Sequence, residues 1–259
     1  MLRGLTVLGL LLCAGLATAE VKTKKVEYKF DGVTFIGHIY YDDATKDKRP
    51  GVLVVHEWWG LDDYAKMRAE MLAKMGYVAF ACDMYGDGKV AEHPKEATEM
   101  VGLVRKNQDV WRGRAKAALK ELTSFEYTDG NRLAGIGYCF GGTTCLQLAA
   151  TGADLKAVVT FHSALPKLKD DEAKAIKAKV QVNHGADDKF IAADTISAFK
   201  KSMETAKVPL DFNEYKGAVH SFTVKGAEDR KLDGMKYDKD ADEKSWKAMK
   251  TLFDDVFKK

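Results

Sequence analysis

The sequence predicts an α/β fold with a mostly parallel central sheet, helices on both of its faces and an antiparallel hairpin at the N-terminus. The first observation is a series of short, continuous apolar runs from Gly51 onward, typical of strands that are buried on both faces. The second is that stretches with helical periodicity separate these runs, which gives a βαβα order. The third is a pair of alternating segments before Gly51, which indicates a hairpin.

The individual elements follow from the same patterns. Segments 24–30 and 33–40 alternate with the strand period on either side of Asp31-Gly32, a turn sequence. Later strands are expected at 51–56, 77–82, 132–137, 155–161, 180–183 and 210–215. Helices are expected at 64–75, 95–122, 142–150, 192–206 and 241–257. The charged stretch 167–179 is expected to be a solvated helix or loop.

The composition fits a globular protein and argues against several other classes. The 259 residues are 46% hydrophobic and 31% charged, with only four prolines, unlike collagen, coiled coils or disordered chains. The 41 Lys and Arg residues nearly balance the 38 Asp and Glu residues and are scattered along the chain. A nucleic-acid partner is therefore not expected. The length suits one domain, and we expect a monomer.

Residues 1–19 are expected to be a secretory signal peptide that is not part of the fold. They carry one charge, Arg3, followed by an apolar run over 5–16 and the small residues Ala17-Thr18-Ala19 before Glu20. A transmembrane anchor is the alternative, although the apolar run is short for a bilayer span. Cleavage would place the mature protein in the periplasm or outside the cell, and no later run is long enough to cross a membrane.

Cys139 differs from the other cysteines of the mature chain. Cys82 and Cys145 lie in apolar runs and are most simply buried residues, and an odd number of cysteines does not suit a disulfide framework. Cys139 instead lies between Gly137 and Gly141, where a strand runs into a helix. This G-x-C-x-G turn is the pattern of a nucleophile elbow with Cys in place of Ser.

A nucleophile elbow needs small residues around the nucleophile, so that the strand and the helix can approach closely. The turn would raise the sulfur above the sheet edge at the N-terminus of the helix, which favours thiolate. The Phe140 N–H would then point to the place where an oxyanion develops. The alternative is that both glycines serve an ordinary strand-to-helix turn around a buried cysteine.

An acid and a base are expected to follow such a nucleophile in chain order, each after a later strand. An H-G-x-x-D pattern that ends at Asp188 follows one strand, and His220 stands in the loop after the next. The predicted triad is therefore Cys139, Asp188 and His220. The alternative for Asp188 and its neighbour Asp187 is a role as turn and helix-cap residues.

These motifs make the chain resemble the dienelactone hydrolases of the α/β-hydrolase superfamily. The resemblance covers essentially the whole mature chain and rests on H-E-W-W-G at 56–60, D-M-Y-G at 83–86, G-Y-C-F-G-G at 137–142 and H-S-F at 220–222. It implies an α/β-hydrolase fold in a single domain, residues 20–259. It also implies that Cys139, Asp188 and His220 are the catalytic triad.

The resemblance adds a glutamate beside the nucleophile, and Glu57 stands at that place. The backbone N–H of Trp58 would be the second oxyanion donor. Because a permanently ionised thiol is oxidised in an oxidising compartment, we hypothesise that Glu57 keeps Cys139 a thiol until substrate displaces their contact. The alternative for Glu57 is a solvated loop carboxylate.

Two arginines that grip the substrate carboxylate in family members that cleave dienelactone have no counterpart here. Asp87 and Val224 occupy their places, and Lys225 or Lys89 cannot reproduce bidentate binding of a carboxylate. Dienelactone is therefore not the expected substrate. An aromatic pocket mouth is expected from four side chains, those of Trp58, Trp59, Tyr85 and Phe140.

The sequence therefore predicts a hydrolase of small carboxylic esters, lactones or thioesters that forms an acyl-thioester at Cys139. No cofactor and no metal are expected, because His56, His162 and His184 do not show a close-spaced ligand pair. One alternative is a catalytically silent binding protein on the same scaffold. Another is a hydrolase of acyl or phosphoryl esters that lack a carboxylate, in which Asp87 faces a cationic or neutral group.

Overall fold

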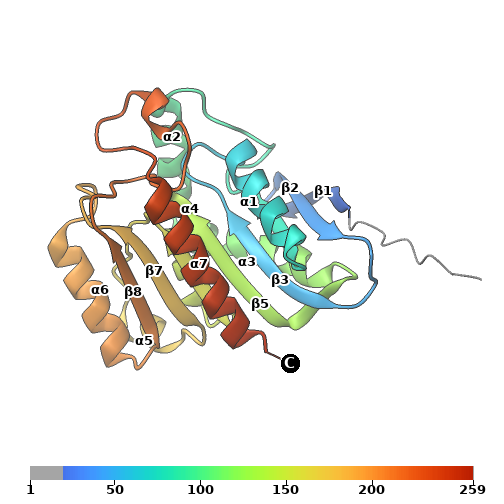
Figure 1. The fold of residues 1–259 in the computed structure, drawn as a ribbon. Coiled ribbons are helices and arrows are strands. Elements are labelled where there is room, and N and C mark those ends of the chain that lie inside the picture. The colour runs from blue at the N-terminus through green and yellow to red at the C-terminus, as the bar shows by residue number, and fades with distance from the viewer. Residues whose placement is uncertain (1–19, 259) are drawn as a thin grey trace, which may run out of the picture.

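The strands of residues 20–258, the part of the chain that the structure describes, form one sheet. In the computed structural model its eight strands follow the order β1-β2-β4-β3-β5-β6-β7-β8. Figure 1 shows this sheet running through the middle of the molecule between layers of helices. The predicted α/β fold, mostly parallel with an N-terminal antiparallel hairpin, is confirmed. The predicted signal peptide, residues 1–19, lies outside the described residues.

The hairpin consists of β1 (Val21–Phe30) and β2 (Val33–Asp42). Its two turn residues are Asp31 and Gly32, whose φ angles are 49° and 74°. Two turn residues with positive φ are typical of a type I′ turn, whose twist matches that of the flanking strands. β2 also pairs antiparallel with β4, so the hairpin extends the parallel part of the sheet.

The other strands are mutually parallel, as their continuous apolar runs predict. They are β3 (Arg49–Val55), β4 (Val78–Cys82), β5 (Thr128–Tyr138), β6 (Ala157–Phe161), β7 (Lys179–Gly185) and β8 (Leu210–Tyr215). Parallel strands end at the same edge of a sheet, and in α/β proteins the loops at this edge form the binding site. The loops after β3, β5, β6, β7 and β8 are therefore brought together.

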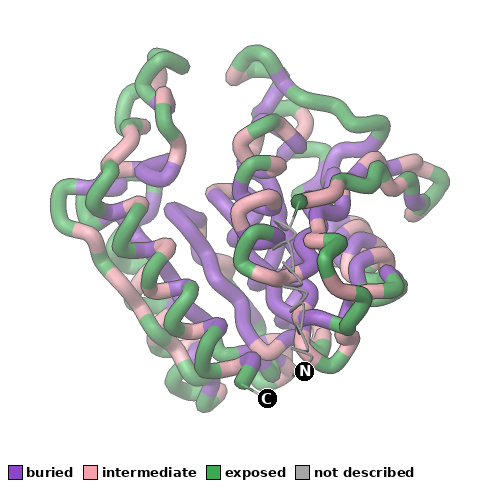
Figure 2. Tube along the Cα trace, turned by 45° about the vertical axis from the view of Figure 1, so that its right-hand side comes forward, coloured by how far each residue is buried: buried purple, intermediate pink, exposed green. Residues whose placement is uncertain are grey.

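Helices cover both faces of the sheet (Figure 1). They are α1 (Asp63–Lys74), α2 (Pro94–Arg105), α3 (Gln108–Ser124), α4 (Phe140–Ala149), α5 (Asp170–Lys174), α6 (Ala193–Thr205), α7 (Lys239–Val256) and the 3-10 helix η1 (Ala227–Arg230). Val52 and Val54 of β3 pack in one core cluster with α1 and α7, whereas Leu53 and Val55 pack in another with α3 and α4. Figure 2 shows the buried residues concentrated along the strands between these layers.

The structure corrects the single helix expected over 95–122. This stretch forms two helices, because α2 ends at Arg105 and α3 begins at Gln108. Asn107 lies at the break, and its side-chain oxygen accepts hydrogen bonds from two amides of the first turn of α3, at 3.0 and 3.2 Å. An Asn that satisfies these amides is an N-cap and starts a new helix.

The remaining sequence features concern membranes and thiols. Over residues 20–258 the helices are too short or too polar to cross a bilayer. Cys82, Cys139 and Cys145 are free thiols, and the first and third are buried, as their apolar surroundings predict.

Candidate active site

Cys139 lies at a sharp turn between β5 and α4. Its backbone angles are φ 50° and ψ −115°, and it is half-buried. A non-glycine residue in such a conformation stores about 1–3 kcal/mol and is found mostly at functional sites. A Cβ at Gly137 would collide with the backbone of Gly141, and a Cβ at Gly141 would collide with the carbonyl oxygen of Val55. The turn therefore requires both glycines.

The helix α4 begins at Phe140, directly after Cys139, and so starts earlier than the sequence predicted. Its first turn includes two glycines without space for a side chain: a Cβ at Gly141 would meet the backbone of β3, and a Cβ at Gly142 would meet Ser163 and Thr160. Across residues 20–258, no group accepts a hydrogen bond from the backbone amide of Phe140 or of Trp58. Both amides are thus available to bind an anion, and the Phe140 amide lies at a helix N-terminus.

His220 and Asp188 form a buried pair in the loops after β8 and β7. His220 Nδ1 lies 2.8 Å from Asp188 Oδ2, and Asp188 Oδ1 accepts a hydrogen bond of 2.9 Å from the Phe190 amide. The neighbouring Asp187 is exposed. Burial by itself lowers the pKa of His220, but the charge of Cys139 and the hydrogen bonds to Asp188 and Cys139 outweigh it and raise this pKa from 6.5 to about 10.

The backbone of Glu57 is held by the preceding histidine. His56 Nδ1 donates to the carbonyl oxygen of Glu57 at 2.5 Å, and His56 Nε2 accepts from the Met84 amide at 3.2 Å. Burial lowers the pKa of His56. A neutral imidazole with one donor and one acceptor nitrogen satisfies both contacts, so His56 ties the loop after β3 to the loop after β4.

The Glu57 side chain is buried, with 3% of its surface exposed. Its Oε1 accepts a hydrogen bond of 2.8 Å from Ser221 Oγ. Burial raises the pKa of Glu57 from 4.5 to about 7, although the Ser221 hydrogen bond opposes the rise. Ser221, next to His220, thus links Glu57 to the loop that carries His220.

Trp59 and Tyr85, two of the four aromatic residues expected at the pocket mouth, are almost fully buried, at 4% and 7% exposure. The Tyr85 hydroxyl donates to the carbonyl oxygen of Trp58 at 2.7 Å, and the Tyr85 ring stacks on Phe140 with centroids 5.8 Å apart. Tyr85 therefore links the two residues whose amides are the candidate oxyanion donors. The Arg230 guanidinium lies 4.2 Å from the centroid of the Trp59 ring.

Asp83, the first residue of the D-M-Y-G motif, holds the backbone of the loop after β4. Its carboxylate is fully buried and accepts hydrogen bonds from four backbone amides, those of Ile36, Tyr85, Gly86 and Gly88, at 2.7 to 3.2 Å. Such a carboxylate fixes the loop backbone. The motif thus positions Tyr85.

The two positions that hold arginine in dienelactone-cleaving family members are occupied differently. Asp87 is exposed and forms an ion pair of 3.2 Å with Lys89. Val224 is half-buried and lines a surface cavity on the side of α1. Lys225 lies over the ring of Tyr237. Arg230 lies outside the motifs of the sequence, which is why it could not be predicted as a site residue, and its charge acts on Glu57.

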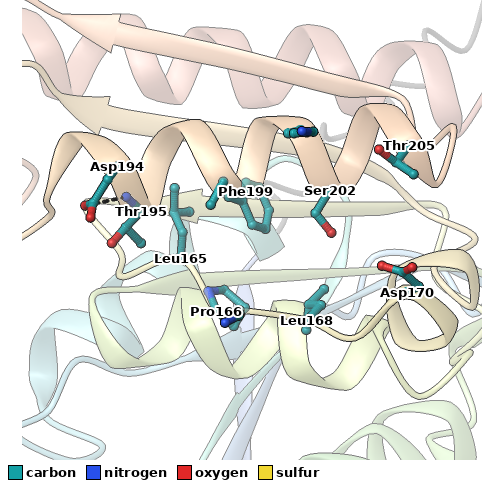
Figure 3. Close-up of a pocket in the computed structure, with 12 residues that line it drawn as sticks. Leu165, Pro166, Leu168, Asp170, Asp194, Thr195, Phe199, Ser202 and Thr205 are labelled. Carbon is teal, nitrogen blue, oxygen red and sulfur yellow. Dashed lines mark hydrogen bonds between the residues drawn. The ribbon is translucent and has the colours of Figure 1, made fainter.

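One surface cavity lies away from these residues. It has a volume of about 470 Å³ and lies between the loop after β6 and helix α6 (Figure 3). Leu165, Pro166 and Phe199 contribute its apolar lining. None of the predicted catalytic residues lines it. In the described part of the chain, no cluster of three or more His, Cys, Asp or Glu side chains is arranged to hold a metal ion.

Comparisons with known proteins agree with this architecture. The family model described as "Dienelactone hydrolase family" matches residues 37–257. "Protein usf" of Aquifex pyrophilus is 31% identical over 209 residues, which cover 79% of this chain and 88% of that protein. The crystal structure of a dienelactone hydrolase-like promiscuous phosphotriesterase from metagenomic libraries matches with a TM-score of 0.90 at 39% identity. That match covers 92% of this chain and 99% of the other. A structure named m3DLH matches with a TM-score of 0.89 at 37% identity, covering 91% and 98% of the two chains.

Proposed function

The chain belongs to the dienelactone hydrolase family, and from that membership we propose that it hydrolyses small carboxylic esters, lactones or thioesters with Cys139, His220 and Asp188 as its catalytic triad. The observation that carries the proposal is the strained turn at Cys139, whose sulfur acts on His220 of the buried pair His220 and Asp188. A nucleophile, a base and a residue that orients the base are the parts that acyl transfer needs.

In the first half of the proposed reaction, Cys139 is acylated. Its proton passes to His220, and the thiolate attacks the carbonyl carbon of the substrate. The amides of Phe140 and Trp58 hold the resulting oxyanion. When the intermediate collapses, the bond to the leaving group breaks, and this group takes the proton from His220. An acyl-thioester at Cys139 remains.

In the second half, water releases the acid. The thiolate charge is one cause of the raised pKa of His220, and acylation removes that charge. The pKa of His220 then falls, so that His220 can accept a proton from the attacking water. The thioester bond breaks, the carboxylic acid leaves, and the proton on His220 returns to the Cys139 thiolate, which restores the starting thiol.

We do not assign dienelactone as the substrate, because Asp87 and Val224 provide no bidentate carboxylate partner. Arg230 is a cation whose charge acts on Glu57 and whose guanidinium lies over the Trp59 ring. A substrate with an acidic group would approach this arginine, whereas a neutral ester would not depend on it. Comparing esters with and without a carboxylate therefore tests the charge preference.

Phosphotriester hydrolysis is a second candidate activity. The support is the likeness to the promiscuous phosphotriesterase, at 39% identity over nearly the whole of both chains. Asp87 stands where dienelactone-cleaving family members have an arginine, and its ion pair with Lys89 leaves little net charge there. Such a position suits a neutral phosphotriester. Here Cys139 would attack phosphorus, expel an alcohol or phenol, and lose its phosphoryl group to water.

The test is turnover by the protein and by its Cys139→Ala variant. The substrates are a series of carboxylic esters and one neutral phosphotriester with the same chromogenic leaving group. We expect turnover of at least one ester and a loss of at least about a thousandfold in the variant. Equal activity of the two proteins would refute the proposed nucleophile. Binding of esters without any turnover would favour the silent binding protein.

We also propose that the protein is exported and acts as a monomer in the periplasm or outside the cell. The support for export is the residue pattern of 1–19. The intact mass of protein recovered from its native envelope or medium should correspond to a chain that starts at Glu20. A chain that keeps Met1 in the cytoplasm would contradict export, and light scattering would reveal any stable dimer.

A further inference from the structure

A chain of polar side chains, half-buried at its outer end and buried at His162, connects α7 and α1 with Glu57. Arg68 forms an ion pair of 2.5 Å with Asp242, and its Nε donates to the Tyr64 hydroxyl at 3.1 Å. The hydroxyls of Tyr64 and Thr223 lie 2.5 Å apart. Thr223 Oγ1 in turn lies 2.7 Å from Nε2 of His162. The residues come from α1, from α7, from the loop after β8 and from the end of β6, and none of them belongs to the proposed triad.

The direction of the hydrogen bonds along this chain follows from Arg68, because a guanidinium only donates. Tyr64 accepts from Arg68 and therefore has its own proton to give to Thr223. The Thr223 hydroxyl is then free to donate to Nε2 of His162. The reverse direction would leave the Tyr64 proton without an acceptor among residues 20–258, whereas this order gives each hydroxyl proton an acceptor within the protein.

His162 must be neutral for this order to hold, and its surroundings make it so. Its side chain is fully buried. Burial, and then the nearby His220, lower the pKa of His162 well below its ordinary value, and Arg68 acts in the same direction. With Nε2 accepting from Thr223, the single proton of the neutral ring is on Nδ1.

His162 Nδ1 faces the carboxylate of the site. It lies 3.8 Å from Glu57 Oε1 and has no hydrogen-bond partner among residues 20–258. The distance exceeds a hydrogen bond but leaves the N–H dipole close to the carboxylate, in a water-poor interior where such interactions are strong. An Nδ1 lone pair at this place would instead repel the carboxylate. His162 itself has a positive φ of 41°, so its placement is maintained at the expense of backbone strain.

We propose that the chain Arg68, Tyr64 and Thr223 fixes His162 as the Nδ1–H tautomer, and that His162 thereby acts as a positioning residue that favours the ionised form of Glu57. The consequence for catalysis rests on the proposed function, since it assumes that Glu57 serves the site. The assignment of the His162 tautomer does not depend on the proposed function.

Other groups act on the same carboxylate and must be kept constant in any test. Ser221 donates a hydrogen bond to Glu57. The charges that face Glu57 are those of Asp62, His220 and Arg230. The variants chosen below leave all of these side chains unchanged.

The first experiment is nitrogen NMR of the whole protein with isotope-labelled histidine. The imidazole shifts distinguish a protonated nitrogen from an unprotonated one, and a His162→Gln variant assigns the signals. We expect the Nδ1–H tautomer alone for His162 near neutral pH. An Nε2–H tautomer, or a charged ring, would overturn the proposal, whether or not the protein hydrolyses any ester.

The second experiment uses Thr223→Val, which removes the hydroxyl at nearly constant volume. The single tautomer should be lost, and the pKa of the Glu57 carboxyl, followed by carbon NMR, should rise by about 0.5 to 1 pH unit. Thr223→Ser should restore both values. Thr123→Val, which removes an exposed hydroxyl of α3, is the control and should change neither.

Tyr64→Phe provides an independent variant if Thr223→Val does not fold. It removes the proton that sets the direction of the chain, so His162 should populate both tautomers. A fixed Nδ1–H tautomer and an unchanged Glu57 pKa in both Tyr64→Phe and Thr223→Val would refute the role of the chain. If ester hydrolysis is absent while these shifts occur, the proposed function fails and the proposal about His162 stands.

Discussion

Replacing Glu57 by Gln should make the protein more stable at alkaline pH. The pKa of this buried carboxyl is raised from 4.5 to about 7 in the folded protein, mainly by burial. Between these values the folded chain holds a proton that the unfolded chain has already lost. The free energy of unfolding contributed by Glu57 therefore falls as the pH rises through this window. Gln keeps the shape of Glu and accepts the Ser221 hydrogen bond but does not ionise.

The magnitude follows from the pKa change. Each pH unit of difference between the folded and unfolded pKa corresponds to about 1.4 kcal/mol. The displacement from 4.5 to about 7 therefore amounts to about 3 kcal/mol of stability lost by the protein on going from acidic to alkaline solution. The variant lacks this loss, so its stability relative to the unmodified protein should increase by about 3 kcal/mol between about pH 4.5 and about pH 8.5.

The assay is urea unfolding followed by circular dichroism at the two pH values, for the protein and for Glu57→Gln. Taking the difference between the proteins at each pH cancels the titration of all other groups. Glu99→Gln, a change at an exposed residue of α2, is the matched control and should give nearly the same difference at both pH values. A Glu57→Gln effect that is equal at both pH values would refute the assignment of a raised pKa.

Three further predictions concern the site and its turn, and a fourth is a comparison in helix α2. Asp188→Asn should lower kcat by about a thousandfold or more, because the 2.8 Å contact that orients His220 is changed; a steady-state assay with near-normal kcat would contradict this. Gly141→Ala should lower the free energy of unfolding by about 1–3 kcal/mol or prevent folding, because its Cβ meets the backbone of β3. Gly102→Ala, in an open position of helix α2, should raise stability by about 0.5–1 kcal/mol. Arg230→Gln should raise KM for anionic esters and leave KM for neutral esters unchanged; equal changes for both would exclude a role in charge selection.

The arrangement of the strands could be predicted because its signals are local. Continuous apolar runs indicated the parallel strands, and Asp31-Gly32 indicated the hairpin turn. The break at Asn107 was missed because helical periodicity continues across it. Asn107 has the side chain of an N-cap, but that signal is weak within a long periodic stretch.

Only those residues of the candidate site that belong to a sequence motif could be predicted. Chain order pointed to Asp188 and His220, which form a hydrogen bond in the structure. The contact between Glu57 and Ser221 joins residues 164 positions apart, and no local pattern encodes it. His162 stands at the end of a strand, as binding residues of α/β proteins often do, yet its neighbours depend on how three loops meet in space.

Intact-mass spectrometry can show whether Cys139 is the nucleophile that becomes acylated. The freshly reduced protein, from Glu20 to Lys259, is mixed with an activated ester and quenched within the first turnover, beside its Cys139→Ala variant. We predict a mass increase by one acyl group, located at Cys139 by peptide mapping and absent from the variant. The absence of an acyl adduct with every acyl size tried, or an adduct that persists in the variant, would show that Cys139 is not the acylated nucleophile.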